Sequence, residues 1–443
     1  MKHGLLWSAG VLVMVAATGC STVETSDADG GEPAVGEVVH VRNDRLDGGE
    51  EIPETVSEQA WVWEGVGYEE MVVERILPLS EGALLVFDDG VVALDTSTGR
   101  EAWSYRKVGV SSASAVSPDG SLVAIASPGS MILLDSADGE SVREIEDTNF
   151  QEGAFVIQDL GLMADDGFVL ARLEERKAAS VRREDWEDGS RWSSDEITCD
   201  GGSSGVVSIL GGFFSPTGVV VHLECGMDES MLVSFDPDNG VEDWRLSSGK
   251  DFSLPSDHYE TLDEVTFAPV GDKAVLQNHA RLRGTVIIDT EKGEVLVDDI
   301  PALVGDDPVR ALEDGYLASR SEKIEEDLWR RHLEVRDFSG EVERSVTVDG
   351  YQGHPVTGLL PLNRSLLSLR NDQQEGNARI SVFPWGDEGE RVVDLDVQVD
   401  VSDMFSRWEQ DREFGPGTFQ EVPGAVLVRE YPFDEIPRVA GLS

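Results

Sequence analysis

A serine-centred motif is the first sequence feature that could carry chemistry. Residues 201–205 read Gly-Gly-Ser-Ser-Gly, which matches the G-x-S-x-G pattern around a nucleophilic serine. Such a serine needs a strand before it, a helix after it, and a His and an acid supplied by an α/β scaffold. Here the flanking segments, one bearing Cys199 and the other reading GVVSIL, both have the composition of β-strands. The sequence therefore predicts a loop at 201–205 and no catalytic residue.

The histidines and acids give no metal or catalytic pattern either. No two histidines have the short spacing of H-x-H or HExxH, the six outside the leader being His40, His222, His258, His279, His332 and His354. The run Asp236–Gly240 resembles the start of a calcium loop but lacks its distal Glu. With 87 Asp and Glu residues, no pair suited to glycoside hydrolysis can be singled out. We expect neither a metal nor a cofactor.

The N-terminus reads as an export signal. Lys2 and His3 precede an apolar stretch from Leu5 to Ala17, which is too short to span a bilayer and ends in small residues before Cys20. This junction resembles the bacterial lipoprotein signal, in which the cysteine becomes lipid-modified and N-terminal. The resemblance implies a signal peptide over 1–19 and attachment to the cell membrane on its extracytoplasmic face. Ordinary secretion with an incidental Cys20 is the alternative.

The chain has three cysteines. If Cys20 carries the anchor, Cys199 and Cys225 remain as a pair in an oxidising compartment, where a disulfide is expected. Two reduced, buried thiols are the alternative. Closing that loop would stabilise the protein by roughly 3 kcal/mol.

Residues 20–58 are expected to be the lipidated cysteine followed by a flexible acidic tether. From residue 21 to 58 the acids greatly outnumber the two basic residues, Arg42 and Arg45, and there is no aromatic residue. Such a segment buries too little apolar area to offset its ordering entropy. A short strand is possible at Val35–Val41.

The charge of the whole chain limits its partners. The 87 acidic residues exceed the 35 basic ones, for a net charge of −52. Non-specific binding to nucleic acid or to anionic lipid is disfavoured because these partners are also negative. An acidic surface suits high salt, and it also results from a genome rich in G and C, so the charge does not identify a function.

One pattern recurs along the chain: a short apolar run, an Asp, three residues and a Gly. Each copy predicts two β-strands joined by a tight turn. The copies lie at 91–103, 131–142, 181–192, 232–244, 286–296, 333–343 and 380–392; the copy at 333–343 is one residue shorter, and the last lacks the Asp. The turns recur at a mean step of about 48 residues, which is room for four strands.

Four-stranded units repeated in this way predict an all-β fold, a β-propeller over residues 59–443. We expect eight blades, with seven as the alternative. After the seventh turn, residues 419–422, 425–431 and 438–443 look like three strands of one more blade. Residues 59–66 can supply its missing outer strand, which would join the two ends of the chain in one blade and close the ring.

The turns resemble those of two propeller families. An Asp-x-x-x-Gly turn followed by Trp, at Trp103, Trp244 and more loosely Trp192, resembles the pyrroloquinoline-quinone (PQQ)-type propeller repeat. The turns SPDG at 117–120 and SPTG at 215–218 resemble those of TolB-like propellers. The quinone enzymes of the first family hold the quinone over a vicinal cysteine pair, whereas Cys199 and Cys225 are 26 positions apart. The resemblance therefore implies a fold and a binding role, without the quinone.

The candidate binding surface lies on the loops between the second and third strands. Three of them are long, at 174–180, 322–331 and 371–378, and they share one face of a propeller. These loops and the shorter one at 279–284 hold much of the scarce positive charge, together with one Trp: Arg176, Lys177, Arg281, Arg283, Lys323, Trp329, Arg330 and Arg331. Neighbouring acids could instead neutralise these cations.

The sequence thus favours a non-catalytic binding or scaffolding module anchored at the cell envelope, with an envelope protein or a glycan as partner. The alternative is an extracytoplasmic hydrolase or lyase with its site in the central channel. Quinone-dependent oxidation is a third possibility, which the cysteine spacing disfavours.

Overall fold

The fold is that of a computed structural model, and in its described residues it consists of strands and turns. It describes residues 34–47, 49, 51–69, 71–127, 129–146, 163–174, 178–186, 189–199, 205–215, 217–225, 229–253, 265–270, 273–278, 285–300, 310–312, 314–324, 328–351, 357–371, 378–386, 389–395, 419–430 and 436–443. Residues 201–204 of the G-x-S-x-G segment lie outside these residues. No helix in them has the length and apolar character needed to cross a membrane.

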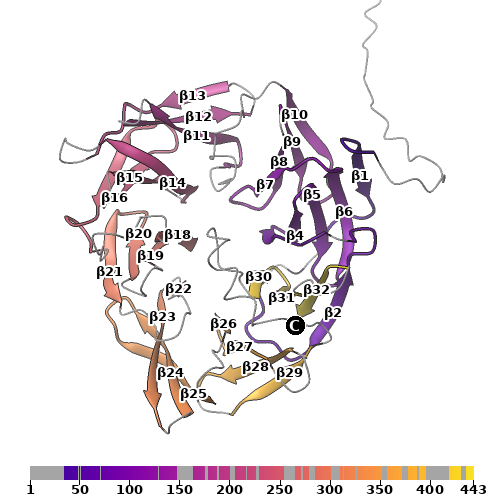
Figure 1. The fold of residues 1–443 in the computed structure, drawn as a ribbon, viewed down its shortest axis with the longest axis vertical. Helices are drawn as coiled ribbons and strands as arrows, with labels where there is room; N and C mark the ends of the chain where they lie inside the picture. Colours follow the sequence, from indigo (N-terminus) through magenta and orange to yellow (C-terminus); the bar gives the residue numbers. More distant parts are fainter. Residues whose placement is uncertain are drawn as a thin grey trace, which may run out of the picture.

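The described residues form eight antiparallel sheets arranged around a common centre (Figure 1). In the second to seventh sheets the chain runs from an inner strand outward through consecutive neighbours, whereas the first and eighth sheets each gain an outermost strand from the N-terminal region. The first sheet contains β3 (Arg75–Leu79), β4 (Gly82–Phe87), β5 (Gly90–Asp95), β6 (Arg100–Lys107) and, outermost, β1 (Val38–Arg42). The second contains β7 (Ala113–Val116), β8 (Leu122–Ser127), β9 (Ser130–Asp135) and β10 (Ser141–Glu146).

The third to sixth sheets follow in chain order. The third has three described strands, β11 (Gly167–Glu174), β12 (Ala178–Asp185) and β13 (Gly189–Ser193). The fourth has β14 (Val206–Phe214), β15 (Val219–Cys225), β16 (Glu229–Phe235) and β17 (Glu242–Ser247). The fifth has β18 (Val265–Val270), β19 (Lys273–Asn278), β20 (Thr285–Asp289) and β21 (Glu294–Ile300). The sixth has β22 (Arg310–Leu312), β23 (Gly315–Lys323), β24 (Leu328–Asp337) and β25 (Val342–Tyr351).

The last two sheets bring the ends of the chain together. The seventh has β26 (Thr357–Pro361), β27 (Ser365–Asn371), β28 (Ala378–Pro384) and β29 (Arg391–Asp394). The eighth has β30 (Phe419–Val422), β31 (Ala425–Arg429) and β32 (Arg438–Leu442) from the C-terminal region, and β2 (Gln59–Glu64) from the N-terminal region. Strand β2 pairs with β32 from Gln59↔Leu442 to Glu64↔Arg438.

The repeated Asp is the acceptor that shapes the predicted turns. In the β5–β6 turn, Oδ1 of Asp95 accepts hydrogen bonds from the N–H groups of Ser97 and Thr98, both at 2.9 Å. Gly99 closes the turn by donating its N–H to the Asp95 carbonyl, at a φ of 70° that favours glycine. Asp135, Asp236, Asp289 and Asp337 cap the corresponding turns in the same manner.

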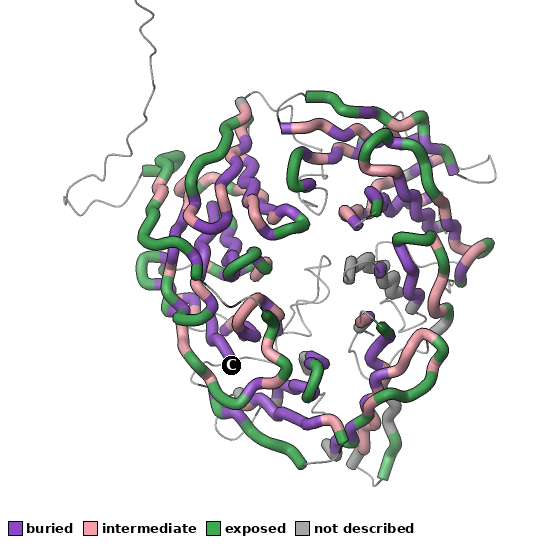
Figure 2. Tube along the Cα trace, turned by 180° about the vertical axis from the view of Figure 1, so that it is seen from behind, coloured by how far each residue is buried: buried purple, intermediate pink, exposed green. Residues whose placement is uncertain are grey.

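The core lies between neighbouring sheets. Strands β4 and β5 are buried along nearly their whole length because adjacent sheets cover both of their faces. Their side chains alternate between two hydrophobic clusters, one shared with the eighth sheet and the other with the second. In Figure 2 the buried residues follow the strands, whereas the exposed ones gather along the outer strands and turns.

Tryptophans fasten several sheets to the next one along the chain. Trp103 of the first sheet is fully buried and donates its indole N–H to the Ser136 carbonyl in the β9–β10 turn, at 2.8 Å. Its ring lies against Gly139, where a Cβ would come within 2.7 Å of it. Three other tryptophans repeat the contact: Trp61 on Thr96 and Gly99, Trp192 on Pro237 and Gly240, and Trp244 on Thr290 and Gly293.

Other contacts between sheets place the aromatic ring in the turn instead. The ring of Phe338, in the β24–β25 turn, faces the Lys273 ammonium of the fifth sheet, 5.8 Å from the ring centroid. Trp385, in the β28–β29 turn, faces Arg344 of the sixth sheet at 5.6 Å. In the β12–β13 turn, Trp186 packs into a cluster with side chains of the second sheet. In each of these three turns the aromatic residue occupies the position after the repeated Asp or its replacement.

The ends of the strands define two faces of the molecule. We call the side that carries the turns between first and second strands and between third and fourth strands the turn face. The opposite side, which carries the loops between second and third strands and the links between sheets, is the loop face. Neighbouring turns contact each other on the turn face: Ser80 donates its N–H to the Gly120 carbonyl, and Asp119 donates its N–H to the Asp165 carboxylate.

The described residues of 34–58, which we call the N-terminal strap, pack on the sheets. The short strand allowed at 35–41 is present as β1, paired with the edge of β6. The remaining segment was expected to be a flexible spacer, yet Leu46 and Val56 are buried, in the clusters of the first and of the seventh and eighth sheets. Two apolar side chains suffice because they enter existing cores, and main-chain hydrogen bonds from residues 43, 44 and 46 to Ala102 and Ala137 hold the start of the segment on the sheets.

Candidate functional site

The β23–β24 hairpin carries four of the eight residues predicted for partner binding. Strands β23, β24 and β25 have 9, 10 and 10 residues, longer than the strands of the neighbouring seventh sheet. Their pairing is continuous along β23, from Gly315↔Asp337 to Lys323↔Trp329. The sheet therefore holds this hairpin in a regular conformation up to residues 323 and 328, on the loop face (Figure 1).

The register decides which charges adjoin the two arginines. Arg330 pairs with Glu322 on β23 and with Asp349 on β25, so that its cross-strand row contains two acids. Arg331 pairs with Ser321 and Val348, so that its row contains no acid. Successive residues of a strand point to opposite faces of the sheet, which separates these two rows. Both arginines are half-buried, and the register places Glu322 and Asp349 in the Arg330 row.

His332 follows the two arginines on β24 and contacts both neighbouring strands. Its Nδ1 lies 3.2 Å from the Thr347 hydroxyl on β25, and its Nε2 lies 3.5 Å from the Glu322 carboxylate on β23. The side chain of Glu322 is 65% exposed, whereas His332 is largely covered. These contacts stiffen the hairpin and present a charged rim to solvent.

The other four predicted residues lie outside the described residues. Arg176 and Lys177 lie between β11 and β12, whose last pair is Glu174↔Ala178. Arg281 and Arg283 lie between β19 and β20. Both connections join a second strand to a third, and the described strand ends on either side of them lie on the loop face.

Sequence reasoning missed apolar residues on this face. Leu173 and Ile324, at the ends of β11 and β23, are 40% and 39% exposed. Val66 and Val72, in the link from β2 to β3, are 71% and 40% exposed. In the sequence each of them is an aliphatic residue next to a charged loop. An analysis that counts charged residues does not select such a position. These four side chains add exposed apolar surface to the loop face.

The described residues contain a Ser–His pair, but its position makes it structural. Nε2 of His222 lies 2.5 Å from the Ser230 hydroxyl, and both residues are fully buried within the fourth sheet. Burial lowers the pKa of His222 to about 3, so the ring is neutral. A substrate has no path to this serine. Among the residues described, no group of three or more His, Cys, Asp and Glu side chains is placed to hold a metal ion.

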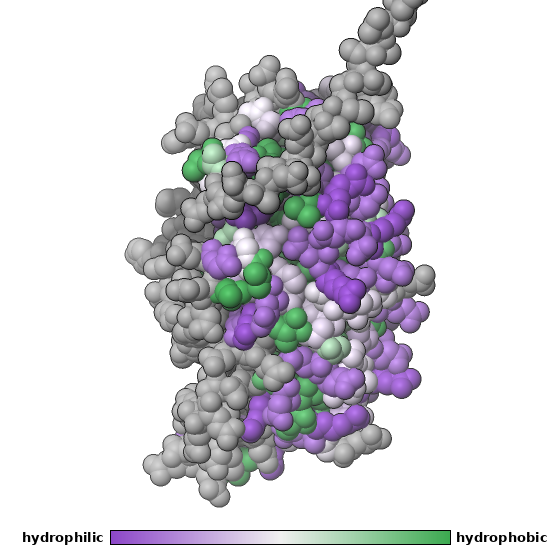
Figure 3. Space-filling model, turned by 90° about the vertical axis from the view of Figure 1, so that its right-hand side faces the viewer, coloured by the Kyte–Doolittle hydropathy of each residue, from purple (hydrophilic) through white to green (hydrophobic). Residues whose placement is uncertain are grey.

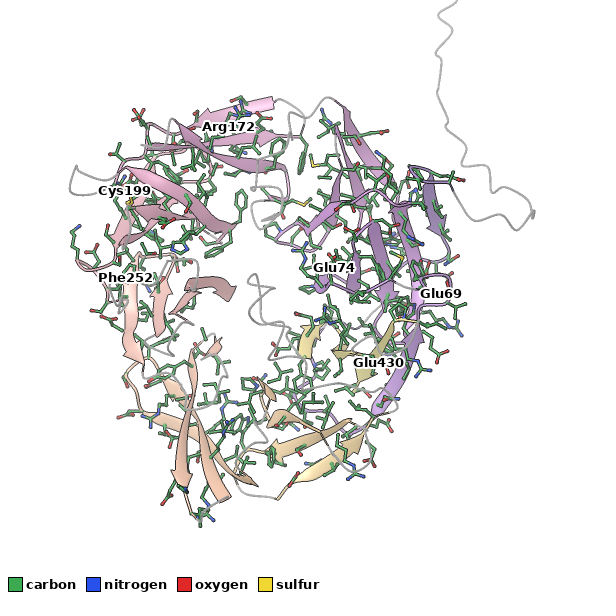
Figure 4. All side chains as sticks on the ribbon, viewed as in Figure 1. Glu69, Glu74, Arg172, Cys199, Phe252 and Glu430 are labelled. Carbon is green, nitrogen blue, oxygen red and sulfur yellow. A yellow bond between two sulfur atoms is a disulfide. The ribbon has the colours of Figure 1, made fainter. Side chains whose placement is uncertain are left out.

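The predicted disulfide is present. Cys199 and Cys225 are bonded, with 2.08 Å between the sulfur atoms, and both are buried (Figure 4). The bond joins the end of β15 to the segment that precedes β14, next to the buried Ile197 and Val206. The disulfide is a structural bond that ties this segment to the fourth sheet.

The repeat, the docked tryptophans and the circle of sheets agree with one family model. The model describes the outer membrane protein assembly factor BamB, and it matches residues 54–337, which is more than half of the chain. The chain belongs to this family. Its members are β-propellers with PQQ-like repeats, so the all-β propeller predicted from the sequence is confirmed. The matched region begins just before β2 and ends with β24, and it includes the candidate hairpin.

Several solved structures are similar in overall fold at low identity. BamB from Moraxella catarrhalis is 12% identical, with a TM-score of 0.46, over 83% of this chain and 96% of its own. The WD40 domain of SCAP from fission yeast is 11% identical, with a TM-score of 0.48, over 86% and 98%. The quinohemoprotein alcohol dehydrogenase ADHIIG from Pseudomonas putida HK5 is 12% identical, with a TM-score of 0.47, over 90% and 78%. No curated protein gives a significant match.

Proposed function

We propose that this protein is a lipid-anchored, extracytoplasmic β-propeller that acts as a non-catalytic scaffold for an envelope protein. The observation that carries the proposal is the match of residues 54–337 to a family named for an outer membrane protein assembly factor. A protein with that name acts on other envelope proteins. The export signal over 1–19 and the lipidation site at Cys20 support a location on the extracytoplasmic side of the cell membrane.

The scaffold in this proposal is a closed ring of eight blades, one for each sheet. The pairing of β2 with β32 supports the count because it gives the eighth sheet its fourth strand. The N–H of Ser57 donates to the carbonyl of Ser443 at 2.7 Å, so β2 starts where β32 ends. A closed ring leaves only short sheet edges and makes a rigid platform for loops.

The loop face is the binding surface in this proposal. The β23–β24 hairpin supplies Lys323, Trp329, Arg330 and Arg331 on a continuous sheet, and exposed aliphatic residues lie on the same side. Arginine and aliphatic side chains on a rigid support suit a protein surface. On a chain of net charge −52, a local group of cations also favours an acidic partner surface.

Charge reversal tests this surface. The loop-face variant is Lys323→Glu, Arg330→Glu and Arg331→Glu, and the matched control is Arg100→Glu, Arg143→Glu and Arg391→Glu, three exposed arginines on outer strands. Both change the net charge by the same amount. After chemical cross-linking in intact cells and purification from solubilised membranes, we expect one envelope protein to be enriched with the wild type and the control. The loop-face variant should recover it at least about tenfold less. Equal recovery from both variants would reject the loop face.

A further inference from the structure

We infer that the anchored protein turns its loop face toward the membrane, so that its partner is an integral membrane protein that it contacts close to the bilayer. This orientation depends on the proposed lipid anchor, to which it adds the side of the molecule that faces the bilayer. It follows from the place where the N-terminal strap leaves the sheets, which the described contacts fix.

The chain leaves the molecule at the loop face. Strand β1 starts opposite the end of β6, at Val38↔Lys107, and runs antiparallel to it. Just before β1, Gly36 donates its N–H to the Val108 carbonyl at 2.7 Å, and Val108 donates back to Glu37 at 3.0 Å. Lys107 in turn donates its N–H to Asp89, in the β4–β5 loop. Residue 36 therefore lies beside a link and a loop of the loop face.

The strap cannot easily shift this exit point. It crosses from the loop face at β1 to the turn face, where the side chain of Arg42 lies 3.2 Å from Asp138. Leu46 donates its N–H to the Ala137 carbonyl at 2.8 Å, and its side chain is 2% exposed. Farther on, Glu51 accepts a hydrogen bond from Gly424, and Glu54 forms an ion pair with Arg364. The first, second, seventh and eighth sheets thus all contact the strap.

The length of the remaining tether limits the orientation. Fourteen peptide units join Cys20 to Ala34, which reach about 50 Å at full extension. A flexible chain of this length has a root-mean-square extension of about 20 Å. If the turn face pointed to the membrane, the tether would also have to span the height of β6, about 25 Å for its eight residues. Gaussian chain statistics then favour the loop-face orientation by roughly tenfold.

Electrostatics favour the same orientation. The repeated turns place Asp95, Asp135, Asp236, Asp289 and Asp337 on the turn face. An anionic membrane surface repels this array, whereas Lys323, Arg330 and Arg331 lie at the loop-face end of the sixth sheet. Figure 3 shows the side of the molecule that carries β1 and β6, where strongly hydrophilic surface covers one flank and hydrophobic areas lie nearer the middle. A partner held beneath the loop face has to present its surface within reach of the bilayer.

Two cysteine reporters on the sixth sheet test the orientation. Ile324→Cys lies on the loop face, and Ser339→Cys lies in the β24–β25 turn on the turn face, and both positions are exposed. The three native cysteines are assigned to the anchor and the disulfide, so that each variant has one reactive thiol. The full-length lipidated protein is labelled with a donor dye and bound to vesicles of phosphatidylcholine and phosphatidylglycerol that carry an acceptor on their headgroups. We expect clearly stronger energy transfer from position 324 than from 339.

The controls separate this inference from the proposed anchor. Lengthening the tether with a Gly-Ser insertion after residue 33 should reduce the difference between the reporters. Flotation of the vesicles reports the anchor itself, so loss of flotation in the wild type overturns the anchor and the inference together. Flotation with equal or reversed transfer overturns the orientation alone. If Cys20→Ser protein still floats and keeps the stronger signal at 324, the loop face binds lipid directly and the assignment of a protein partner is wrong.

Discussion

Single residues explain how neighbouring sheets recognise each other. A tryptophan from one outer strand rests on the glycine of the next turn and donates its indole N–H to that turn's carbonyl, as Trp103 does with Gly139 and Ser136. The residue after the Asp is then small or cyclic: Thr96, Ser136, Pro237 or Thr290. At Phe338 and Trp385, where an aromatic residue occupies that position, the preceding sheet contributes a cation instead. In each of these contacts, therefore, only one of the two neighbouring sheets contributes a large aromatic ring.

Gly139 should be needed both for its backbone conformation and for the ring it accommodates. Gly139→Ala places a methyl group 2.7 Å from Trp103 at a φ of 69°, whereas Gly340→Ala meets nothing within 4 Å at a φ of 88°. We expect a loss of about 1 kcal/mol for Gly340→Ala and about 2–4 kcal/mol for Gly139→Ala, from the left-handed backbone alone and from backbone plus overpacking. Chemical denaturation of the full chain measures both. Equal losses would mean that the contact with tryptophan is not constraining.

His222 should make stability depend on pH. Its pKa is lowered to about 3 by burial, so the unfolded chain binds a proton below about pH 6.5 and the folded chain does not. The free energy of unfolding should therefore fall as the pH decreases from about 6.5 to 3, by up to about 1.4 kcal/mol per pH unit from this group. Comparing the wild type with His222→Gln across this range isolates the effect, because other titrating groups are shared. Parallel curves for the two proteins would contradict it.

At the scale of strands and segments, the turns were predictable and the strap was not. Asp-x-x-x-Gly is a local signal, since the carboxylate and the glycine act within five residues, as Asp95 and Gly99 show. The docking of Leu46 and Val56 depends on surfaces built from residues far away in sequence, and an acidic segment with few apolar residues gives no local sign of it. For the candidate site, the hairpin at 322–331 was visible, but the register that sets Arg330 between Glu322 and Asp349 needed the structure.

The strap should depend on its one buried leucine in the first cluster. Leu46→Ala removes a side chain that is 2% exposed, and it should cost about 2–4 kcal/mol of strap docking. Ile52→Ala is the matched control, because Ile52 lies in the same segment but is 49% exposed. Limited proteolysis followed by mass spectrometry should show faster cleavage between residues 34 and 58 in Leu46→Ala only. Comparable cleavage of both variants would show that Leu46 does not hold the segment.

At the scale of the whole molecule, net charge opposes the contacts between sheets. The full chain carries a net charge of −52, and the self-repulsion of these charges is weakened by salt. Paired groups such as Arg106 and Asp89, 2.9 Å apart and largely buried, are less sensitive to screening. Salt should therefore act on the excess of exposed acids more than on these pairs.

The thermal midpoint should accordingly rise with salt. Between about 0.02 M and 1 M NaCl, where the screening length falls well below the width of a sheet, we expect an increase on the order of 5 °C. Sucrose, which stabilises compact states without screening charge, serves as the comparison. Calorimetry in both series measures the difference. A midpoint that does not change or falls with NaCl would show that exposed acids are already balanced in the folded protein.

The pairing of β2 with β32 also has a consequence for the order of events during synthesis. Residues 59–64 emerge early, yet their partner strand is completed nearly four hundred residues later. The same delay applies to Glu51 and Glu54, whose partners Gly424 and Arg364 belong to the last two sheets. Until then the early segment cannot take its place in the fold. The part of the chain that leaves the ribosome first is among the last to be placed.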